Sequence, residues 1–488
     1  MADPDGREGP RDECGVFGIY GPGHEVSRLA YFALFALQHR GQESAGIAAA
    51  DTGGYIITQR ALGLVSQVFK EHDLQALGGD LAIGHVRYST TGSNEWENSQ
   101  PVHRSAGSGG NRRELALAHN GNLINAVEMH AKLRAQGVTF SSTSDSEIIA
   151  AALASHPAET IEDAVADVIP QLRGAFSTVV MTNDKVVAFR DPAGVRPMAL
   201  GKFGDAWCVA SESCAFLTIG AEYVRDVAPG EMVVLDADGL TSRQIGDPAA
   251  REAFCVFEYI YFARPDSQMG GGSLQVARER MGAVLAREAP APGADLVIAV
   301  PDSGNPAARG YSRASGIPQG EGFVKNRYIA RTFIQPGQEL RKHGLRLKFN
   351  PLPEVVDGKS LVVVDDSIVR GNTTRQIVQM LRDAGAREVH MRSSAPPIKN
   401  PCHYGVDMST REEMVAHNRT VDEIAAHLGC DSLAYLSLTG VYEAVGAADP
   451  GRHCDACFSG NYPLQGTTEA NGKFALETSL PLAQSAAR

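Results

Sequence analysis

The run SLVVVDDSIVRG, residues 360–371, limits the fold more than any other part of the sequence. Four successive apolar residues, three of them β-branched, are typical of a strand that is buried on both faces of a parallel sheet. A polar loop with a glycine follows, then the helix-forming segment TTRQIVQMLRDAG and the strand-like REVHMRSS. This order predicts a βαβ unit. The apolar run DLVIAVPDSG predicts a second buried strand of the same sheet.

The sequence before about residue 247 has a different pattern. Short alternating or apolar segments such as CGVFGIYG, LAIGHVRYS, AFSTVVMTN and MVVLDADG are separated by Gly, Asn and Asp turns, which predicts many short strands. Apolar residues recur at helical spacing over 26–38 and 158–172. We therefore predict an α+β sandwich, in which helices cover sheets, ahead of an α/β domain.

The net charge limits the kinds of partner that the chain can have. Its 488 residues carry a formal net charge of −12, which argues against charge-driven binding to nucleic acid or to an anionic membrane. No apolar run approaches the ~18 residues that span a bilayer, and the first residues, MADPDGREGPRDE, lack the apolar core of a secretion signal. The prediction is a cytoplasmic protein of two or three domains, with a disordered tail over residues 465–488.

Cys14 begins the segment CGVFGIYG after thirteen mostly polar residues. We interpret residues 1–13 as a removable propeptide. Cleavage of the Glu13–Cys14 bond would give one residue both a thiol nucleophile and a free α-amino group, whose ordinary pKa of about 8 suits a general base. Taken alone, a lone cysteine near a terminus is more often a buried residue on a first strand.

Five motifs in this half decide between these two readings. ECGVFGIYG, LQHRGQESAGIA, GHVRYSTTG, AHNGNL and STSDSE together resemble the glutaminase domain of the N-terminal-nucleophile amidotransferases. The resemblance implies an αββα sandwich, autocatalytic processing and Cys14 as the nucleophile. It also implies that Arg87 holds the glutamine carboxylate by a two-point hydrogen bond and that Asp145 holds the ammonium group.

Asn120 and Gly121 match the position of the oxyanion hole in the same family. Attack of a thiolate on an amide places negative charge on the carbonyl oxygen, which needs hydrogen-bond donors about 3 Å away. The resemblance implies that the side-chain amide of Asn120 and the backbone N–H of Gly121 are these donors. Glycine allows the close approach that a side chain would block. Outside this context an Asn-Gly pair predicts a hairpin turn.

The segment LVVVDDSIVRGNTT resembles the phosphoribosyl pyrophosphate signature of type I phosphoribosyltransferases. Two carboxylates end the strand, and the loop leads to a helix N-terminus, where phosphate binds readily. The resemblance implies that the aspartates receive the ribose hydroxyls and hold Mg²⁺, and that the loop cradles the 5-phosphate. The residues are Asp365 and Asp366, then Arg370, Gly371, Asn372, Thr373 and Thr374. The family more often has Thr at position 372.

Two further features accompany this signature. Ser303, in VPDSGNPAA, matches the family's pyrophosphate loop and is a candidate third oxygen ligand of Mg²⁺, although a plain ST-turn would also explain it. By composition, the segment KNRYIARTFIQPGQELRKHGLRLKF is equally consistent with a solvated surface loop. Its beginning, KNRYIARTFI, resembles the family's flexible loop, whose closure would keep water from the reacting carbon. Its charges are Lys325, Arg327, Arg331, Arg341, Lys342, Arg346 and Lys348 against Glu339. A buried strand followed by an acidic helix cap would explain one aspartate but not the whole signature.

Eight cysteines in a chain without a secretion signal do not indicate a disulfide scaffold. Cys454 and Cys457 form a C-x-x-C pair, which alone suits a redox pair, zinc or an iron–sulfur cluster. We interpret Cys208, Cys214 and Cys430 as structural.

Cys255 and Cys402 are the candidates that would complete a site of four thiolates. Spacing alone leaves zinc and a cluster equally open. Their segments, FCVFEYIYFARPDS and NPCHYGVDMS, resemble the cluster-binding members of the amidophosphoribosyltransferase family. The resemblance implies one [4Fe–4S] cluster per subunit on Cys255, Cys402, Cys454 and Cys457, in a structural or regulatory role.

The resemblance to this family extends from Cys14 to about Pro463. It implies a glutamine amidotransferase domain over 14–246 and a phosphoribosyltransferase domain, with the cluster-binding segment, over 247–464. It further implies synthesis of 5-phosphoribosylamine from glutamine and phosphoribosyl pyrophosphate, one Mg²⁺ per subunit, a homotetramer, and feedback by purine nucleotides such as AMP and GMP.

Two other functions would explain part of the sequence. Another N-terminal-nucleophile amidotransferase would lack DDSIVRGNTT beside VPDSG. A non-catalytic, purine-sensing regulator could keep the phosphoribosyl loop, but it would have no reason to retain Cys14, Arg87, Asn120 and Asp145 together.

Overall fold

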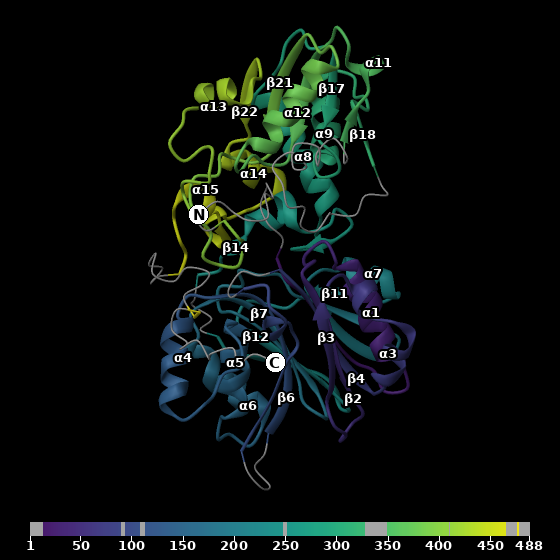
Figure 1. Ribbon diagram of the computed structural model, residues 1–488, viewed down its shortest axis with the longest axis vertical. Helices are drawn as coiled ribbons and strands as arrows, with labels where there is room; N and C mark the ends of the chain where they lie inside the picture. The colour runs from purple at the N-terminus through teal and green to yellow at the C-terminus, as the bar shows by residue number, and fades with distance from the viewer. Residues whose placement is uncertain are drawn as a thin grey trace, which may run out of the picture.

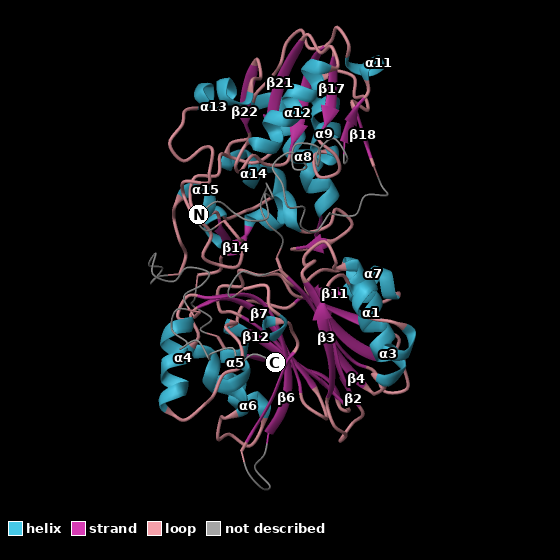
Figure 2. Ribbon diagram, in the orientation of Figure 1, coloured by secondary structure: helices cyan, strands magenta, loops and turns pink. Residues whose placement is uncertain are grey.

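The computed structural model describes residues 13–88, 93–107, 113–246, 251–326, 349–408, 410–464 and 476–477. These residues form two halves that are stacked along the long axis of the molecule (Figure 1). The N-terminal half contains two large sheets, and the other half contains a smaller sheet between helices (Figure 2).

The first sheet of the N-terminal half has seven strands, and neighbouring strands are antiparallel. Its central strands are buried along their whole length, because helices pack on one face and the second sheet packs on the other. In order across the sheet, the strands are β11 (Glu222–Asp226), β9 (Ala199–Phe203), β10 (Ala206–Ala210), β1 (Gly15–Tyr20), β4 (Leu81–Arg87), β2 (Ser44–Ala50) and β3 (Ile57–Leu62).

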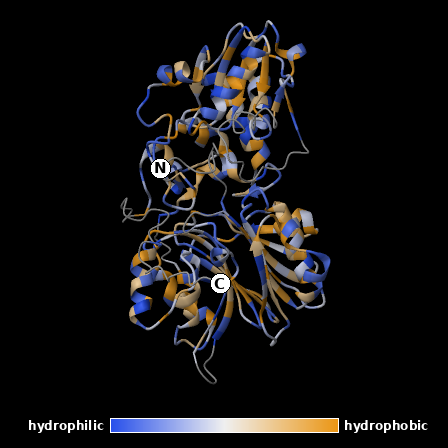
Figure 3. Cartoon of the chain, in the orientation of Figure 1, coloured by the Kyte–Doolittle hydropathy of each residue, from blue (hydrophilic) through white to orange (hydrophobic). Residues whose placement is uncertain are grey.

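The second sheet has six strands and is also antiparallel. In order, they are β13 (Gly239–Gln244), β12 (Glu231–Asp236), β8 (Val186–Arg190), β7 (Gly174–Met181), β6 (Arg113–Leu123) and β5 (Val102–Ala106). An apolar core that includes Val16, Ile83 and Val179 lies between the two sheets. Figure 3 shows the apolar residues gathered along these strands.

Helices cover the outer faces of both sheets. α1 (Val26–Ala36) and α7 (Cys214–Ile219) pack on the first sheet around a core of their own. α4 (Ala126–Ala135), α5 (Asp145–Ala154) and α6 (Ile161–Val168) pack on the second. This arrangement is the predicted αββα sandwich, and α1 and α6 lie where helical spacing predicted helices.

The other half is built on a parallel sheet of four strands, again as predicted. In order, they are β17 (Leu296–Ala299), β20 (Ser360–Asp365), β21 (Glu388–Ser393) and β22 (Ser432–Tyr435). α8 (Leu274–Glu288), α9 (Asn305–Ser315) and α14 (Leu438–Val445) cover one face, and α12 (Asn372–Asp383) and α13 (Val421–Leu428) cover the other. Burial on both faces explains why the strands are continuous apolar runs.

Two short pairings complete this half. β14 (Phe254–Cys255) pairs in parallel with β23 (His453–Cys454), which joins the beginning of this half to the end of the chain. β18 (Phe323–Lys325) pairs with β19 (Phe349–Pro351) on either side of the basic segment. Of that segment's predicted charges, only Lys325 is described, and the others lie outside the described residues.

The ends of the chain are described only in part. Glu13 is the one described residue of the predicted propeptide. Of the predicted tail, Leu476 is buried against the core under α4 to α6, and the backbone N–H of Ser93 donates to the Glu477 carboxylate at 2.7 Å; the rest of 465–488 lies outside the described residues. Within the described ranges, no helix is both long and apolar enough to cross a membrane.

Candidate active sites

Cys14 lies immediately before β1. Side chains alternate along a strand, so Cys14 falls on the same side as Val16, which faces the second sheet. The thiol is buried and donates a hydrogen bond to the carbonyl oxygen of Tyr88 at 3.3 Å. Burial raises the pKa of Cys14 to about 11, although Tyr88 and the charge of Arg87 act in the opposite direction. The thiol is therefore protonated at neutral pH and needs a base to become a nucleophile.

The predicted glutamine-binding residues surround this thiol. Arg87 ends β4 and donates from both terminal nitrogens to the carbonyl oxygen of Ser93 at 3.3 Å. Asp145 begins α5, and its carboxylate accepts a hydrogen bond from the backbone N–H of Leu123 at 2.9 Å. The charges of Arg87 and Asp145 both act on the pKa of Cys14, so the fold brings these three residues together from distant segments.

Asn120 and Gly121 lie inside β6, not in a hairpin turn. The side-chain nitrogen of Asn120 is buried and has no hydrogen-bond partner in the described part of the chain. Since buried donors are nearly always paired, this nitrogen is suited to a ligand oxygen. Gly121 has φ of +150°, and a Cβ there would lie 1.9 Å from the carbonyl oxygen of Ala175 on β7. Position 121 must therefore be glycine for a second reason, because the backbone of β7 leaves no space for a side chain.

Asp365 and Asp366 lie at the carboxyl end of β20, where parallel sheets bind ligands. Ser303, from the loop after β17, and Ser367 both donate to the Asp366 carboxylate, Ser367 at 2.6 Å. Burial and the charge of Asp366 raise the pKa of Asp365 well above its usual range, and burial raises the pKa of Asp366. Two buried carboxylates and a hydroxyl are a hard-oxygen donor set that suits Mg²⁺.

The predicted phosphate loop leads from this pair into α12. Gly371 precedes the helix with φ of +82° and has no side chain to cap the first turn. Thr374 is buried, whereas Asn372 is exposed. Arg370 donates to the Glu413 carboxylate at 2.6 Å, so its guanidinium already has an anionic partner. The helix N-terminus itself favours a phosphate.

The loop predicted to receive pyrophosphate packs against β20. Gly304 permits this approach, because a Cβ there would lie 2.5 Å from the carbonyl oxygen of Val364. Lys325, at the end of β18, forms an ion pair with Asp302 of the same loop. The basic segment therefore begins beside the candidate pyrophosphate site.

The four predicted ligand cysteines line one cavity of about 20 Å³. Cys255 and Cys454 are paired in register between β14 and β23. Cys457 lies in the short helix α15 (Ala456–Ser459), and its carbonyl oxygen accepts from the backbone N–H groups of Lys399 and Asn400, close before Cys402. Three distant segments thus meet at one place.

Burial controls the protonation of these thiols. It raises the pKa of Cys454 to about 12 and raises the pKa values of the other three cysteines above their usual range. Arg196 also lines the cavity, and its charge lowers the pKa of Cys255 and of Cys402. Among the described residues, no group of three or more His, Cys, Asp or Glu side chains is already arranged to hold a metal ion. The four thiols line one cavity, and their side chains would have to turn toward a metal group for it to bind.

Known proteins share both the sequence and the fold. A profile of the glutamine amidotransferase domain matches residues 85–218. The amidophosphoribosyltransferase of Mycobacterium tuberculosis is 49% identical over 96% of this chain and 90% of its own length. That of Synechococcus elongatus is 49% identical over 96% of this chain and 95% of its own. The chain belongs to the amidophosphoribosyltransferase family.

A solved structure supports the membership of this family across both halves. The glutamine phosphoribosylpyrophosphate amidotransferase from B. subtilis, complexed with ADP and GMP, superposes with a TM-score of 0.87 at 44% identity. The match covers 94% of this chain and all of that one. An N-terminal glutaminase sandwich followed by a phosphoribosyltransferase sheet is therefore the architecture that this amidophosphoribosyltransferase family member shares with a solved relative.

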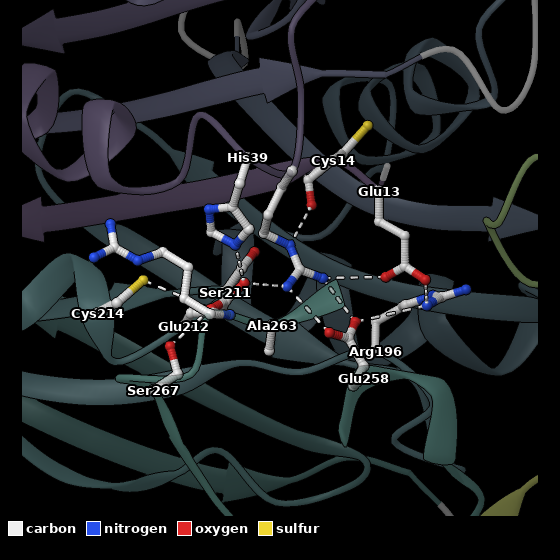
Figure 4. Close-up of polar contacts among 12 residues, drawn as sticks. Glu13, Cys14, His39, Arg196, Ser211, Glu212, Cys214, Glu258, Ala263 and Ser267 are labelled. Atoms are coloured by element: carbon white, nitrogen blue, oxygen red, sulfur yellow. Dashed lines mark hydrogen bonds and ion pairs between the residues drawn. The ribbon is translucent and has the colours of Figure 1, made fainter. Parts of the chain in front are cut away.

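A buried charged cluster that the sequence did not predict lies between the two halves of this family member (Figure 4). We call it the interface cluster, and its members are Glu13, Arg40, Arg196, Glu212 and Glu258. Glu13 lies inside ECGVFGIYG, and Arg40 lies inside LQHRGQESAGIA. A charged residue within such a motif was the only feature of the sequence that could have indicated this cluster. Arg196 and Glu212 lie outside every motif.

Proposed function

We propose that the two candidate sites carry out the two halves of one synthesis. Family membership makes the chain a glutamine-dependent glycosyltransferase. The overall reaction converts glutamine, phosphoribosyl pyrophosphate and water to 5-phosphoribosylamine, glutamate and pyrophosphate, the first committed step of purine synthesis. The observation that carries this assignment is the presence in one chain of a buried thiol among the charges of Arg87 and Asp145 and of a buried carboxylate pair at a parallel sheet edge.

In the first half-reaction, the sulfur of Cys14 attacks the carboxamide carbon of glutamine. Arg87 would hold the substrate carboxylate and Asp145 its ammonium group, since both charges lie around the thiol. Asn120 and the N–H of Gly121 would stabilise the oxyanion. The bond from the carboxamide carbon to the amide nitrogen breaks, the nitrogen leaves as ammonia, and a thioester forms. Water then attacks the thioester and releases glutamate and the thiol.

Maturation fits this mechanism. The pKa of Cys14 is about 11 in the chain that retains Glu13, so few thiolates exist at neutral pH. Removal of residues 1–13 would create an α-amino group on Cys14 itself, and that group would serve as the base. We assign residues 14–246 to the glutaminase domain and 247–464 to the transferase domain.

In the second half-reaction, ammonia attacks C1 of the ribose as the bond from C1 to the pyrophosphate oxygen breaks. Asp365 and Asp366 would orient the ribose hydroxyls, and with Ser303 they would hold one Mg²⁺, which would neutralise charge on the leaving pyrophosphate. The first turn of α12, over Asn372, Thr373 and Thr374, would bind the 5-phosphate. For Arg370 to join them, its ion pair with Glu413 has to open.

The cysteine cavity would hold the metal group of this chain. Four free thiols around one buried space are a donor set that fits a [4Fe–4S] cluster, and a Cys₄ zinc site is the alternative. Binding would require the thiols to lose protons and turn inward. Because displacement of pyrophosphate by ammonia needs no electron transfer, we assign a structural or regulatory role. Free thiols also suit the reducing cytoplasm, where we place the protein.

We further infer that purine nucleotides inhibit the enzyme and that the assembly is a homotetramer. The B. subtilis relative was solved with ADP and GMP. A nucleotide 5-phosphate has the same chemistry as the 5-phosphate of phosphoribosyl pyrophosphate, so the first turn of α12 is a site where the two would compete.

The test is a glutaminase assay with and without phosphoribosyl pyrophosphate, in which glutamate, pyrophosphate and phosphoribosylamine are measured together. Coupled half-reactions predict that phosphoribosyl pyrophosphate raises glutamine hydrolysis and that the three products appear in equal amounts. A non-catalytic regulator would bind phosphoribosyl pyrophosphate but release no pyrophosphate, and that result would refute the assignment. A different amidotransferase would hydrolyse glutamine without any response to phosphoribosyl pyrophosphate.

A further inference from the structure

Glu13, the last residue of the proposed propeptide, is as buried as a residue of the apolar core. Its side chain is fully buried, and its two carboxylate oxygens have different partners. Arg40 Nη2 donates to Oε2 at 3.1 Å, and Arg196 Nη1 donates to Oε1 (Figure 4). Glutamate is almost never fully buried unless it is paired. Glu13 therefore has two buried ion-pair partners, although it belongs to the segment that would be removed.

Arg40 contacts both sides of the bond that would be cleaved. Its Nε donates to the carbonyl oxygen of Cys14 at 3.2 Å, while its Nη2 donates to the Glu13 carboxylate. The guanidinium group is planar and presents its donors in a rigid fork. One side chain thus fixes the residue before the Glu13–Cys14 bond relative to the residue after it.

The transferase half holds both arginines in place. Glu258 accepts from Arg40 Nη2 at 2.7 Å and from Arg40 Nη1 at 3.1 Å. Arg196 Nε donates to the carbonyl oxygen of Tyr404 at 2.7 Å. Glu258 and Tyr404 both follow residue 247, so the transferase half adds contacts to the two arginines that hold Glu13, beside the contact of Arg40 with Glu212.

The interface cluster keeps ion pairs that do not involve Glu13. Burial and the neighbouring Glu258 raise the pKa of Glu13 well above its usual range. Arg40 contacts both Glu212 and Glu258, and His39 contacts Glu212 at 2.7 Å. Matched buried pairs can persist. Removal of Glu13 would therefore leave the contact of Arg40 with Glu258, which joins the two halves.

We propose that Arg40 and Arg196 position the Glu13–Cys14 bond for cleavage through the Glu13 side chain, with the docked transferase half holding both arginines in place through Glu258 and Tyr404. This inference rests on the proposed maturation at Cys14. Cleavage consumes one water: the bond between the Glu13 carbonyl carbon and the Cys14 nitrogen breaks, Glu13 leaves with a new carboxylate, and Cys14 keeps the nitrogen as an amine. Glu13 is thus a positioning residue, and Cys14 carries out the cleavage.

The test follows maturation of the full chain after cell-free synthesis, with intact mass recorded over time. Glu13→Ala removes both hydrogen bonds, and we expect cleavage to slow at least tenfold. Glu13→Gln keeps the volume and one acceptor oxygen but replaces the other oxygen with an amide group, so we expect a slower rate than the parent and a faster rate than Glu13→Ala. Asp12→Asn, a neighbouring acid of the same segment, is the matched control and should mature at the parent rate. Cleavage of Glu13→Ala within threefold of the parent rate would overturn the proposal, as would equal slowing by Asp12→Asn.

Two further measurements separate the possible failures. The melting temperature of each precursor, recorded with the mass, shows whether a slow variant is folded, and Glu13→Gln leaves no cavity to confuse this reading. A chain that starts as Met-Cys14, from which the cell removes the initiator methionine, should be active without any Glu13. If the parent chain never loses residues 1–13 yet is fully active, the proposed maturation fails. If the parent matures normally and Glu13→Ala matches it, only the positioning role fails.

Discussion

The two candidate sites differ in how their residues are distributed along the chain. The glutamine site collects Cys14, Arg87, Asn120 and Asp145 from two sheets and a helix, so it exists only in the folded half. The phosphoribosyl site lies almost wholly within residues 361–374, where one strand, one loop and one helix N-terminus follow each other. A contiguous site can be recognised from its local chemistry, whereas a dispersed site can be recognised only through a resemblance.

The two sites also differ in how ready they are for substrate. Asn120 offers a buried donor that has no partner in the described part of the chain. In the transferase half, Arg370 is paired with Glu413, and Lys325 is paired with Asp302. Glutamine would meet the Asn120 donor directly, although Arg87 already donates to the Ser93 carbonyl oxygen and lies 3.9 Å from the Glu43 carboxylate. Phosphoribosyl pyrophosphate would meet two ion pairs in its site. The following predictions test this contrast, from the largest effect to the smallest.

Cys454→Ser should have the largest effect, because the cysteine cavity touches both halves. A Cβ at Gly405, three residues after Cys402, would lie 3.3 Å from the backbone of Gly121, and Asn122 donates to the carbonyl oxygen of His403 at 3.0 Å. We expect anaerobic parent protein to contain about four iron atoms and four sulfides per chain. The variant should contain none and should lose both half-reactions.

Cys430→Ser is the matched control for that experiment, because Cys430 is half-buried at the end of α13 and lies outside the cavity. It should keep its iron. Stoichiometric zinc without iron in the parent, or unchanged iron in Cys454→Ser, would show that the cluster assignment is wrong.

Asn120→Ala should affect one site only. Loss of one oxyanion donor lowers kcat by about 10²- to 10³-fold in enzymes that use such donors. We expect a loss of this size in synthesis from glutamine and no loss in synthesis from added ammonia. Asn183→Ala, an exposed residue of the same half, is the control. Equal losses with both nitrogen sources would mean that Asn120 supports the fold and not the oxyanion.

The smallest effect concerns acid stability of the glutaminase half. His85 is buried on β4, donates through Nε2 to the carbonyl oxygen of His119, and has its pKa lowered by burial to about 3. The unfolded chain binds this proton below about pH 6.5, so stability falls as pH drops below that value. At pH 5, about 1.5 units below the pKa of histidine in the unfolded chain, this group lowers the free energy of unfolding by about 2 kcal/mol.

Between pH 7 and pH 5, the free energy of unfolding of His85→Gln should therefore fall by about 2 kcal/mol less than that of the parent. Urea unfolding followed by tryptophan fluorescence measures this half alone, because Trp96 and Trp207 are the only tryptophans of the chain. The exposed His72→Gln should behave as the parent does. An unchanged pH dependence in His85→Gln would mean that other groups, such as buried His119, account for acid sensitivity.

Sequence patterns predicted the layers of both halves, because strand and helix periodicity report burial directly. LVVV predicted a strand with two covered faces, and β20 has them. The partners of single residues were not predictable in this way. Arg40 contacts Glu258 only because the two halves dock, and Gly121 is required by Ala175 on a strand far along the sequence. The four cysteines were matched by resemblance, but their common cavity depends on the pairing of β14 with β23.

The central claim is that Cys14 only liberates nitrogen, whereas Asp366 serves the step that both nitrogen sources share. The most direct measurement is phosphoribosylamine formation from glutamine and from ammonia in Cys14→Ala and in Asp366→Asn, with glutamine hydrolysis measured beside it. We predict that Cys14→Ala loses synthesis from glutamine but keeps synthesis from ammonia. Asp366→Asn should lose both routes, with little recovery at raised Mg²⁺, and should retain glutaminase activity. Normal synthesis from ammonia by Asp366→Asn would contradict the account.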